Sequence, residues 1–442
     1  MNIKNLKPFY NIETNKDVFL SEEDVEIDIQ GQKFKNRAKI YCRLLPTPRI
    51  VFNFELTSSD GQLALMSTFF SNNVSILIKQ KSIHGHVISY TGNVSLISIV
   101  WVPDHEPVIL ITTENDRICS IIFHLFNFKD FVGKSDFAEN QDPISKKIAF
   151  IRLCWQKWEI ELRSLFTTDE VFKTLKSKGG FGLTHLGLVR RNDNSNFTSD
   201  EAEKLLIGLR FFLSFAKGCW SNPSLAVYLD DCDKKIAEFL SSPSETWNSP
   251  TSWFDPYHVE QLSNLFPLFM EKWNNEYWGS TLKEVIYWYL NANNTMRGID
   301  AGIILTQSAI ERLSYEYVVN NNKLLSKNGF KDLRASDKFR RLFSSINIPV
   351  ELPSSLENMK RLSKQHNWID APHALTEIRN SLVHPEHKRK GQFRDALFEA
   401  WNLGLWYLEL SILRICDYTE TYSNRLTNRV VGQVEKVPWE NS

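Results

Sequence analysis

Cysteine is scarce in this 442-residue chain, and its placement argues against two kinds of site. No two of the six cysteines form a Cys-x2-Cys pair, which is the usual half-site of a structural zinc ion. They are also too dispersed for the disulfide framework of a small secreted domain. Since no cluster of carboxylates suggests a metal either, we expect reduced cysteines, no metal and no cofactor. The six are Cys42, Cys119, Cys154, Cys219, Cys232 and Cys416.

Long apolar runs and net charge are also missing. No run approaches the roughly 18 apolar residues of a membrane-spanning helix, and the start, MNIKNLKPFYNIETN, lacks the apolar segment of a signal peptide. We therefore expect a cytoplasmic protein. Lys and Arg together number 52, as do Asp and Glu, so any affinity for nucleic acid must come from a local basic patch.

Residues 1 to 145 are predicted to form a β-rich, sandwich-like domain or an open barrel. Residues 25–29 alternate apolar and polar side chains, which is the period of a half-buried strand. Residues 108–111 form a continuous apolar run that suits a buried strand, and residues 59–61 are typical of a turn. His84 and His86 flank a glycine here, but no neighbouring carboxylate or cysteine in the sequence completes a metal site.

Residues 146 to 278 are predicted to be a mixed α and β region. Residues 182–189 are strand-like, Thr198 and the acidic residues after it favour a helix start, and the Pro- and Ser-rich tract 241–256 is typical of a loop. We interpret His185, which stands alone, as a core histidine rather than a ligand.

The pattern turns helical between residues 279 and 424, which predicts an all-α bundle. In the helix expected from Asp370 to His384, Asp370 is a good N-cap, Pro372 is tolerated in the first turn and Pro385 ends the helix. The remaining residues, 425–442, should form an extended tail, and the chain as a whole is an α+β multidomain protein. The other predicted helices cover residues 280–290, 298–319, 337–346, 354–366 and 392–418.

The last turns of the helix expected from Asp370 hold the residues best suited to chemistry. Its sequence there is Glu-Ile-Arg-Asn-Ser-Leu-Val-His-Pro, in which Arg379 and Asn380 lie off the apolar stripe and His384 stands where the helix stops. Residues five apart lie about 140° apart around an ideal helix. Arg379 and His384 can therefore converge only if the helix end distorts or if two copies face each other.

This segment resembles the signature of the HEPN superfamily, which is Arg, a polar residue that is often Asn, three variable positions and His, late in a small helical bundle. Residues 309–313, Ala-Ile-Glu-Arg-Leu, also look like the family's first core helices, so the resemblance covers about 280–420. A β-rich region before such a domain is similar to bacterial abortive-infection proteins. The resemblance implies a HEPN-like bundle, an RNA substrate, a homodimer and a role in phage defence or as a toxin, with the N-terminal regions sensing a trigger protein or ligand.

The Arg-x4-His spacing is not specific by itself, because Arg361 and His366 share it. We prefer the Arg379 motif because Asn380 follows the arginine and the histidine abuts the helix break. Some members of the family carry a Tyr two residues after the His, which a partner nucleotidyltransferase modifies. Glu386 stands at that position here, so this arrangement is not implied.

These side chains suit cleavage of RNA without a metal, because RNA supplies its own nucleophile, the ribose 2′-OH. His384 can accept the 2′-OH proton or donate one to the leaving 5′-oxygen. Arg379 can form a bidentate contact with the phosphate as charge builds up, and Asn380 can orient either group. The expected product ends are a 2′,3′-cyclic phosphate and a 5′-OH.

Two neighbouring features are candidate helpers. The segment His387, Lys388, Arg389 and Lys390 would attract a phosphate backbone, although a solvated loop between helices is an equal alternative. Glu311 is a possible auxiliary partner for the arginine or histidine, with a surface glutamate as the alternative.

Two other functions stay open from the sequence. The bundle could be a HEPN-like module that dimerises or binds RNA without cutting it, in which case Arg379 and Asn380 satisfy helix ends and His384 is an ordinary C-terminal helix histidine. It could also be an unrelated helical interaction domain, with the β region binding a ligand.

The basic loop is predicted to contribute affinity rather than chemistry. Replacing Lys388, Arg389 and Lys390 together by Ala should weaken RNA binding and flatten its salt dependence, because fewer phosphates are neutralised. Turnover at saturating RNA should change little. Binding and cleavage measured over a range of salt concentrations test this, and an equal loss of saturated turnover would assign the loop to the transition state instead.

Overall fold

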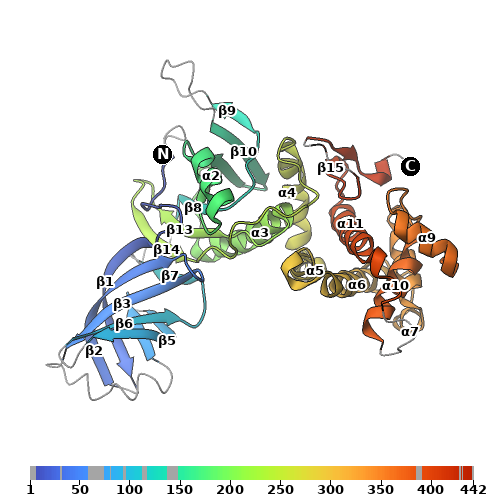
Figure 1. Ribbon diagram of the computed structural model, residues 1–442. Helices are drawn as coiled ribbons and strands as arrows, with labels where there is room; N and C mark the ends of the chain where they lie inside the picture. Colours follow the sequence, from blue (N-terminus) through green and yellow to red (C-terminus); the bar gives the residue numbers. More distant parts are fainter. Residues whose placement is uncertain are drawn as a thin grey trace.

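The structure is a computed structural model that describes residues 6–29, 32–57, 74–79, 81–92, 96–111, 117–136, 148–384, 391–427, 430 and 432–440. It has a mixed architecture, with a β-rich N-terminal region that includes a closed barrel and a helical C-terminal region. In Figure 1 the barrel and the C-terminal helices form opposite ends, and helix α3 runs between them.

The first six strands close into an antiparallel barrel in the order β1-β2-β3-β6-β5-β4. Residues 26–29 of β1 pair with residues 74–77 of β4, so the two end strands of the sheet meet and the barrel is closed rather than open or sandwich-like. Alternate apolar side chains fill its interior, and the rings of Phe52 and Trp101 meet edge to face at 5.1 Å. The strands are β1 (Val18–Ile29), β2 (Gln32–Arg43), β3 (Arg49–Thr57), β4 (Val74–Ile78), β5 (Lys81–Gly92) and β6 (Leu96–Pro103).

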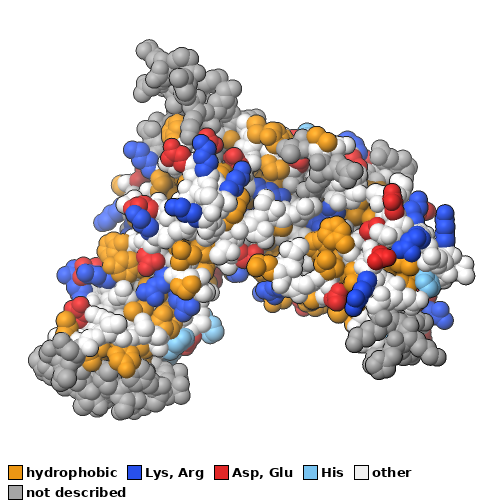
Figure 2. Space-filling view, in the orientation of Figure 1, with side chains coloured by type: hydrophobic (Ala, Val, Ile, Leu, Met, Phe, Trp, Pro, Cys, Tyr) orange, Lys and Arg blue, Asp and Glu red, His pale blue; other side chains and the backbone are white. Residues whose placement is uncertain are grey.

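Opposite charges line up across the outer face of β1 and β2. The register places four acidic residues of β1 against four basic residues of β2: Glu22 with Lys39, Asp24 with Arg37, Glu26 with Lys35, and Asp28 with Lys33. The basic row of β2 is therefore balanced by its neighbour and is no free patch for nucleic acid. Figure 2 shows basic and acidic side chains interspersed over the visible face in the same way.

The second sheet has eight strands in the order β7-β14-β13-β8-β12-β11-β10-β9, and it recruits strands from both sides of residue 145. The predicted boundary at that residue therefore falls inside this sheet, and the change from barrel to sheet lies between β6 and β7. The strands are β7 (Val108–Ile111), β8 (Ser120–Phe126), β9 (Lys134–Asp136), β10 (Ile148–Trp155), β11 (Trp158–Ser164), β12 (Leu183–Arg191), β13 (Pro223–Leu229) and β14 (Lys235–Leu240).

Two helices accompany this sheet, α2 (Thr168–Lys178) and α3 (Ser199–Lys217). Helix α3 starts as predicted, because Thr198 and Glu201 form a capping box in which each side chain binds the other's backbone N–H. His185 on β12 is a core histidine, stacked on Phe131 with ring centroids 4.8 Å apart. Burial lowers the pKa of His185 to about 3, so its ring is neutral.

The helical region contains the predicted helices with ends shifted by a few residues, together with α4 and α7, which are not among those predicted. A π-helical turn, Glu316–Asn321, extends α6. Within the described parts of the chain, no helix is both long and apolar enough to cross a membrane. The helices are α4 (Glu260–Trp273), α5 (Trp278–Ala292), α6 (Ile299–Tyr315), α7 (Lys327–Lys331), α8 (Ala335–Ser345), α9 (Glu357–His366), α10 (Ala371–Val383) and α11 (Leu397–Ile415).

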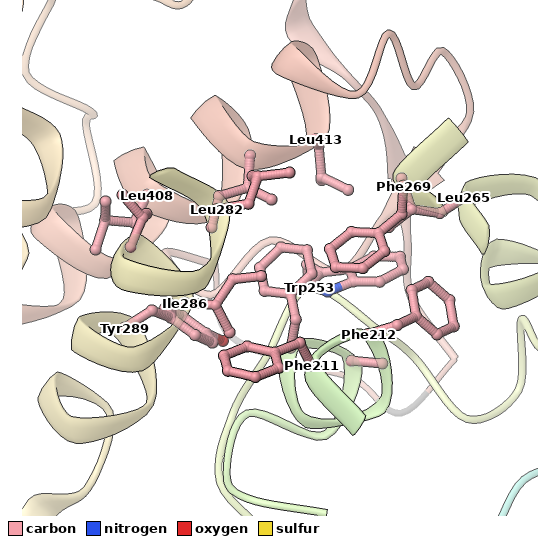
Figure 3. Close-up of a cluster of buried hydrophobic side chains, with 14 of the residues drawn as sticks. Phe211, Phe212, Trp253, Leu265, Phe269, Leu282, Ile286, Tyr289, Leu408 and Leu413 are labelled. Atoms are coloured by element: carbon pink, nitrogen blue, oxygen red, sulfur yellow. The ribbon is translucent and has the colours of Figure 1, made fainter. Parts of the chain in front are cut away.

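One hydrophobic core continues from the second sheet into this helical region. Figure 3 shows Phe212 of α3, Phe269 of α4 and Leu413 of α11 gathered near Trp253, which lies in the 241–256 loop. The predicted division at residue 278 is therefore not a break in the core. Trp288, Tyr289 and Trp406 are aromatic residues that could fill an interface between two chains. Tyr289 and Trp406 are instead buried within the same core, whereas Trp288 is half-buried and packs against it.

The C-terminal tail is not loosely extended as expected, because it is tied down by a buried ion pair. Arg425 donates from Nη2 and Nε to the two carboxylate oxygens of Glu409 on α11, at 2.5 and 3.0 Å, and both side chains are 0% exposed. Tyr289 of α5 donates to the same carboxylate at 2.6 Å, and Arg425 also donates to the Thr251 carbonyl at 3.0 Å. Two short strands, β15 (Thr421–Tyr422) and β16 (Glu435–Lys436), then pair, and Trp439 is buried.

Replacing Arg425 by Met should lower the free energy of unfolding by about 3–5 kcal/mol, because Glu409 would remain as an unpaired buried charge. Lys436→Met is the matched control, since it removes a half-exposed ion pair with Glu420 from the same tail and should cost less than about 1 kcal/mol. Urea unfolding followed by tryptophan fluorescence measures both. A loss for Arg425→Met no larger than the control would contradict the role given to this pair.

Candidate functional site

The N-terminus of α10, the helix that carries the candidate motif, is fixed by a shared carboxylate. Asp370 Oδ1 accepts the His373 backbone N–H at 2.9 Å, which is the N-cap predicted from the sequence. Arg340 of α8 donates to both oxygens of the same carboxylate, at 2.5 and 3.0 Å, and these hydrogen bonds raise the pKa of its guanidinium. The start of α10 is thus anchored to α8.

The inner face of α10 is held against α6. Ala374, Leu375 and Ile378 are fully buried there, as the apolar stripe predicts. Gln307 of α6, itself buried, donates from Nε2 to the Leu375 carbonyl at 2.7 Å. Because one face and the N-terminus are both fixed, the position of Arg379 on the helix is well defined.

The three motif residues lie at the C-terminal end of α10. Arg379 and Asn380 are half-buried neighbours, and Arg379 Nη1 donates to Asn380 Oδ1 at 3.4 Å, which is a long hydrogen bond. His384 leaves the helix with φ −91° and ψ 133°, while its backbone N–H still binds the Asn380 carbonyl at 3.0 Å. Its ring is exposed, and no hydrogen bond within the described chain joins that ring to Arg379 or Asn380. Within one chain a hydrogen bond therefore joins Arg379 to Asn380, and among the described residues none joins either of them to the His384 ring.

The second Arg-x4-His sequence has a different use. Arg361 forms an ion pair with Asp395 at 3.3 Å. The His366 ring stacks on Trp368 with centroids 5.7 Å apart and meets Phe393 edge to face at 5.3 Å. Both residues are exposed, and both contact the segment just before α11, which distinguishes them from the Arg379 motif.

Glu311 and the basic loop were predicted to assist the site. Glu311 binds Lys338 of α8 at 2.6 Å, so it links α6 to α8, and the predicted contact with Arg379 or His384 is not formed. This matches the alternative of a glutamate on an amphipathic helix. The loop residues His387, Lys388, Arg389 and Lys390 lie outside the described residues.

Groups that could hold a metal do not include the motif. Among the described residues, Asp230, Asp231 and Cys232 place three ligand atoms within 4.8 Å of one another, on the turn between β13 and β14. Tertiary folding also brings Asp104 to 2.8 Å from His86, a carboxylate neighbour that the sequence around this histidine does not indicate. The second histidine of that pair, His84, binds Ser75 instead.

The arrangement at the end of α10 can bind and polarise a phosphate group. Arg379 offers a cation that is only weakly engaged by its neighbour, and Asn380 offers an amide in reach of the same ligand. His384 adds an exposed imidazole ring at the end of the same helix. For proton transfer at a phosphate bound by Arg379, a histidine ring must come close to that phosphate. This ring can be that of His384 in the same chain or that of His384 in a second copy.

Comparison with known proteins identifies two matching stretches. Residues 275–436 match the YopA C-terminal domain and residues 113–250 match the YopA central domain. The chain is 25% identical to the SPbeta prophage-derived uncharacterized protein YopA of Bacillus subtilis (strain 168), over 98% of this chain and 97% of that protein. No solved structure gives a significant match. The C-terminal match includes all three motif residues.

Proposed function

We propose that this chain is a metal-independent endoribonuclease of the HEPN type that acts in the cytoplasm. The observation that carries the proposal is the end of α10, where an Arg379–Asn380 pair on a firmly anchored helix adjoins an exposed His384. Its support also includes the contrast with Arg361 and His366, which have the same spacing but are used in packing.

The proposed reaction is transesterification by the RNA itself. His384 takes the proton of the 2′-OH as the 2′-oxygen forms its bond to phosphorus, and the bond to the 5′-oxygen breaks. A protonated histidine, from the same or the second chain, returns a proton to that leaving oxygen. Arg379 stabilises the added negative charge on the phosphate, where a preorganised donor has its greatest effect.

The proposed active unit is a homodimer in which the C-terminal ends of two α10 helices face each other. The reason is geometric, because within one chain no hydrogen bond joins the His384 ring to Arg379 or Asn380 among the described residues, whereas a two-fold axis would bring both sets around one phosphate. The buried aromatic residues Tyr289 and Trp406 take no part in this contact.

The second candidate is a HEPN-like module that dimerises or binds RNA without cutting it. The 3.4 Å hydrogen bond and the separated histidine favour this function if no second copy completes the site. The third alternative is a helical interaction domain with a ligand-binding β region, and it requires neither the Arg379–Asn380 pair nor His384.

We propose that this protein acts in the interaction between a phage and its bacterial host. The YopA relative is described as derived from a prophage. An effector or toxin-like ribonuclease, with the barrel and second sheet sensing a trigger, would fit phage defence or abortive infection.

The activity should be specific for RNA and independent of metals, since the 2′-OH is the nucleophile. Matched RNA and DNA oligonucleotides incubated with the protein in EDTA should show cleavage of RNA alone, with cyclic phosphate ends. His384→Ala should abolish cleavage, while Arg361→Ala, the matched control at the same spacing, should keep it. Cleavage of DNA, or loss of RNA cleavage on chelation, would refute the mechanism.

Mixed dimers test whether the site is shared. Arg379→Ala and His384→Ala subunits should each be inactive alone, and a heterodimer of the two should recover part of the activity through one intact composite site. Differently tagged subunits, co-expressed and purified through both tags, allow this measurement. If proven heterodimers show no activity, the hypothesis of a shared site is refuted. If light scattering shows that the fully active protein is a monomer, the hypothesis of a dimeric active unit is refuted.

A further inference from the structure

A cavity lies where the barrel meets the second sheet, far in the sequence from the α10 motif. Its volume is about 430 Å³, within the range of sites that bind small molecules. The barrel contributes the turn after β2, including Thr47, and the linker between β6 and β7, including Glu106. Leu206 of α3 and Phe239 of β14 contribute apolar wall from the second region.

Arg210 of α3 brings a cation without a counter-ion into this cavity. Its guanidinium lies over the ring of Trp220, with Cζ 4.7 Å from the ring centroid. Its Nε atom is buried without a hydrogen-bond partner, and the described parts of the chain place no carboxylate within ion-pair distance of it. Burial lowers the pKa of Arg210, and no carboxylate of the described residues offsets the cost of burying its charge.

Asn222 also lines the cavity. Its Nδ2 donates to the Ser242 carbonyl at 3.1 Å, which fixes the orientation of the amide. Its Oδ1 has no hydrogen-bond partner and is buried, so this oxygen has almost no surface open to the cavity.

Glu106 also lines the cavity and connects its two sides. One carboxylate oxygen accepts the Ile50 N–H of the barrel at 2.7 Å, and the other accepts the Ser242 N–H at 2.6 Å. These backbone groups fix the carboxylate at the junction of the two regions, but its negative charge remains. The cavity wall therefore holds one cation, Arg210, and one backbone-bound carboxylate, and its surface is mainly apolar.

We propose that this cavity binds a small organic anion, with a carboxylate or phosphate paired to Arg210 and an apolar body against Leu206 and Phe239. The N-terminal half of the chain would bind its small-molecule ligand at this site. It stands independently of the ribonuclease proposal, because binding is measured without RNA.

Calorimetric titration of the full chain with two matched probe pairs tests this. Indole-3-acetate and neutral indole-3-acetamide differ in the carboxylate, and AMP and adenosine differ in the phosphate. At least one of the two anions should bind, at least tenfold more tightly than its neutral partner. The anion that binds tells which acid group the site prefers.

Variants assign the binding to the cavity. Arg210→Gln should weaken binding of that anion by about 10- to 100-fold, the range expected for a charged hydrogen bond. Arg191→Gln is the matched control, because Arg191 also lies over an aromatic ring, that of Trp158 at 5.0 Å, but outside the cavity, and it should change nothing. If Arg210→Gln does not fold, Ile207→Trp, which fills the rim of the cavity from an exposed position, should abolish binding.

Three outcomes would overturn the proposal. The first is that neither anion binds to the wild-type chain, which would leave Arg210 to be satisfied by water. The second is equal binding of the neutral probes, and the third is binding that survives both Arg210→Gln and Ile207→Trp.

Discussion

The buried ion pair between Glu409 and Arg425 is the constraint on which the arrangement of the C-terminal half depends. Removing two charges from water costs several kcal/mol for each ion, and only close pairing with further hydrogen bonds offsets that cost. Here Tyr289 and the Thr251 carbonyl supply those bonds. Because the partners come from α5, α11, the 241–256 loop and the tail, these four segments must come together for either charge to be stable.

Contacts between distant segments also explain why the fold is less divided into separate domains than the sequence pattern suggests. The core residues of α3, α4, α5 and α11 form one cluster, and Tyr289, which binds Glu409 of the ion pair, is one of its members. Glu106 makes the corresponding connection at the other end of the molecule, where its two oxygens join the barrel to the second sheet. Arg210, which lines the same cavity as Glu106, has no carboxylate within ion-pair distance among the described residues.

The helical part was the easier half to predict. Helix ends depend on short-range signals, and the Thr198 capping box and the Asp370 N-cap are both found where the sequence indicates them. The apolar stripe also identifies the buried face of α10. Closure of the barrel was not predictable, because it depends on pairing of β1 with β4 across about 50 residues, a contact that no local pattern encodes. The tail was also wrongly expected to be loose, since its anchoring depends on a carboxylate of another helix.

The sequence by itself determined the type of most elements, the N-cap of α10, and the candidate residues Arg379, Asn380 and His384, because side-chain period and capping act over one or two turns. Tertiary structure alone decided which of those residues meet. It joined Arg379 to Asn380, paired Glu311 with Lys338, and paired Arg361 with Asp395 while stacking His366 on Trp368. It also left Arg210, in a cavity wall, without a carboxylate partner among the described residues. The physical reason is that hydrogen bonds and ion pairs form between groups that are close in space, and proximity across the chain is set by burial of the whole core rather than by neighbours in sequence.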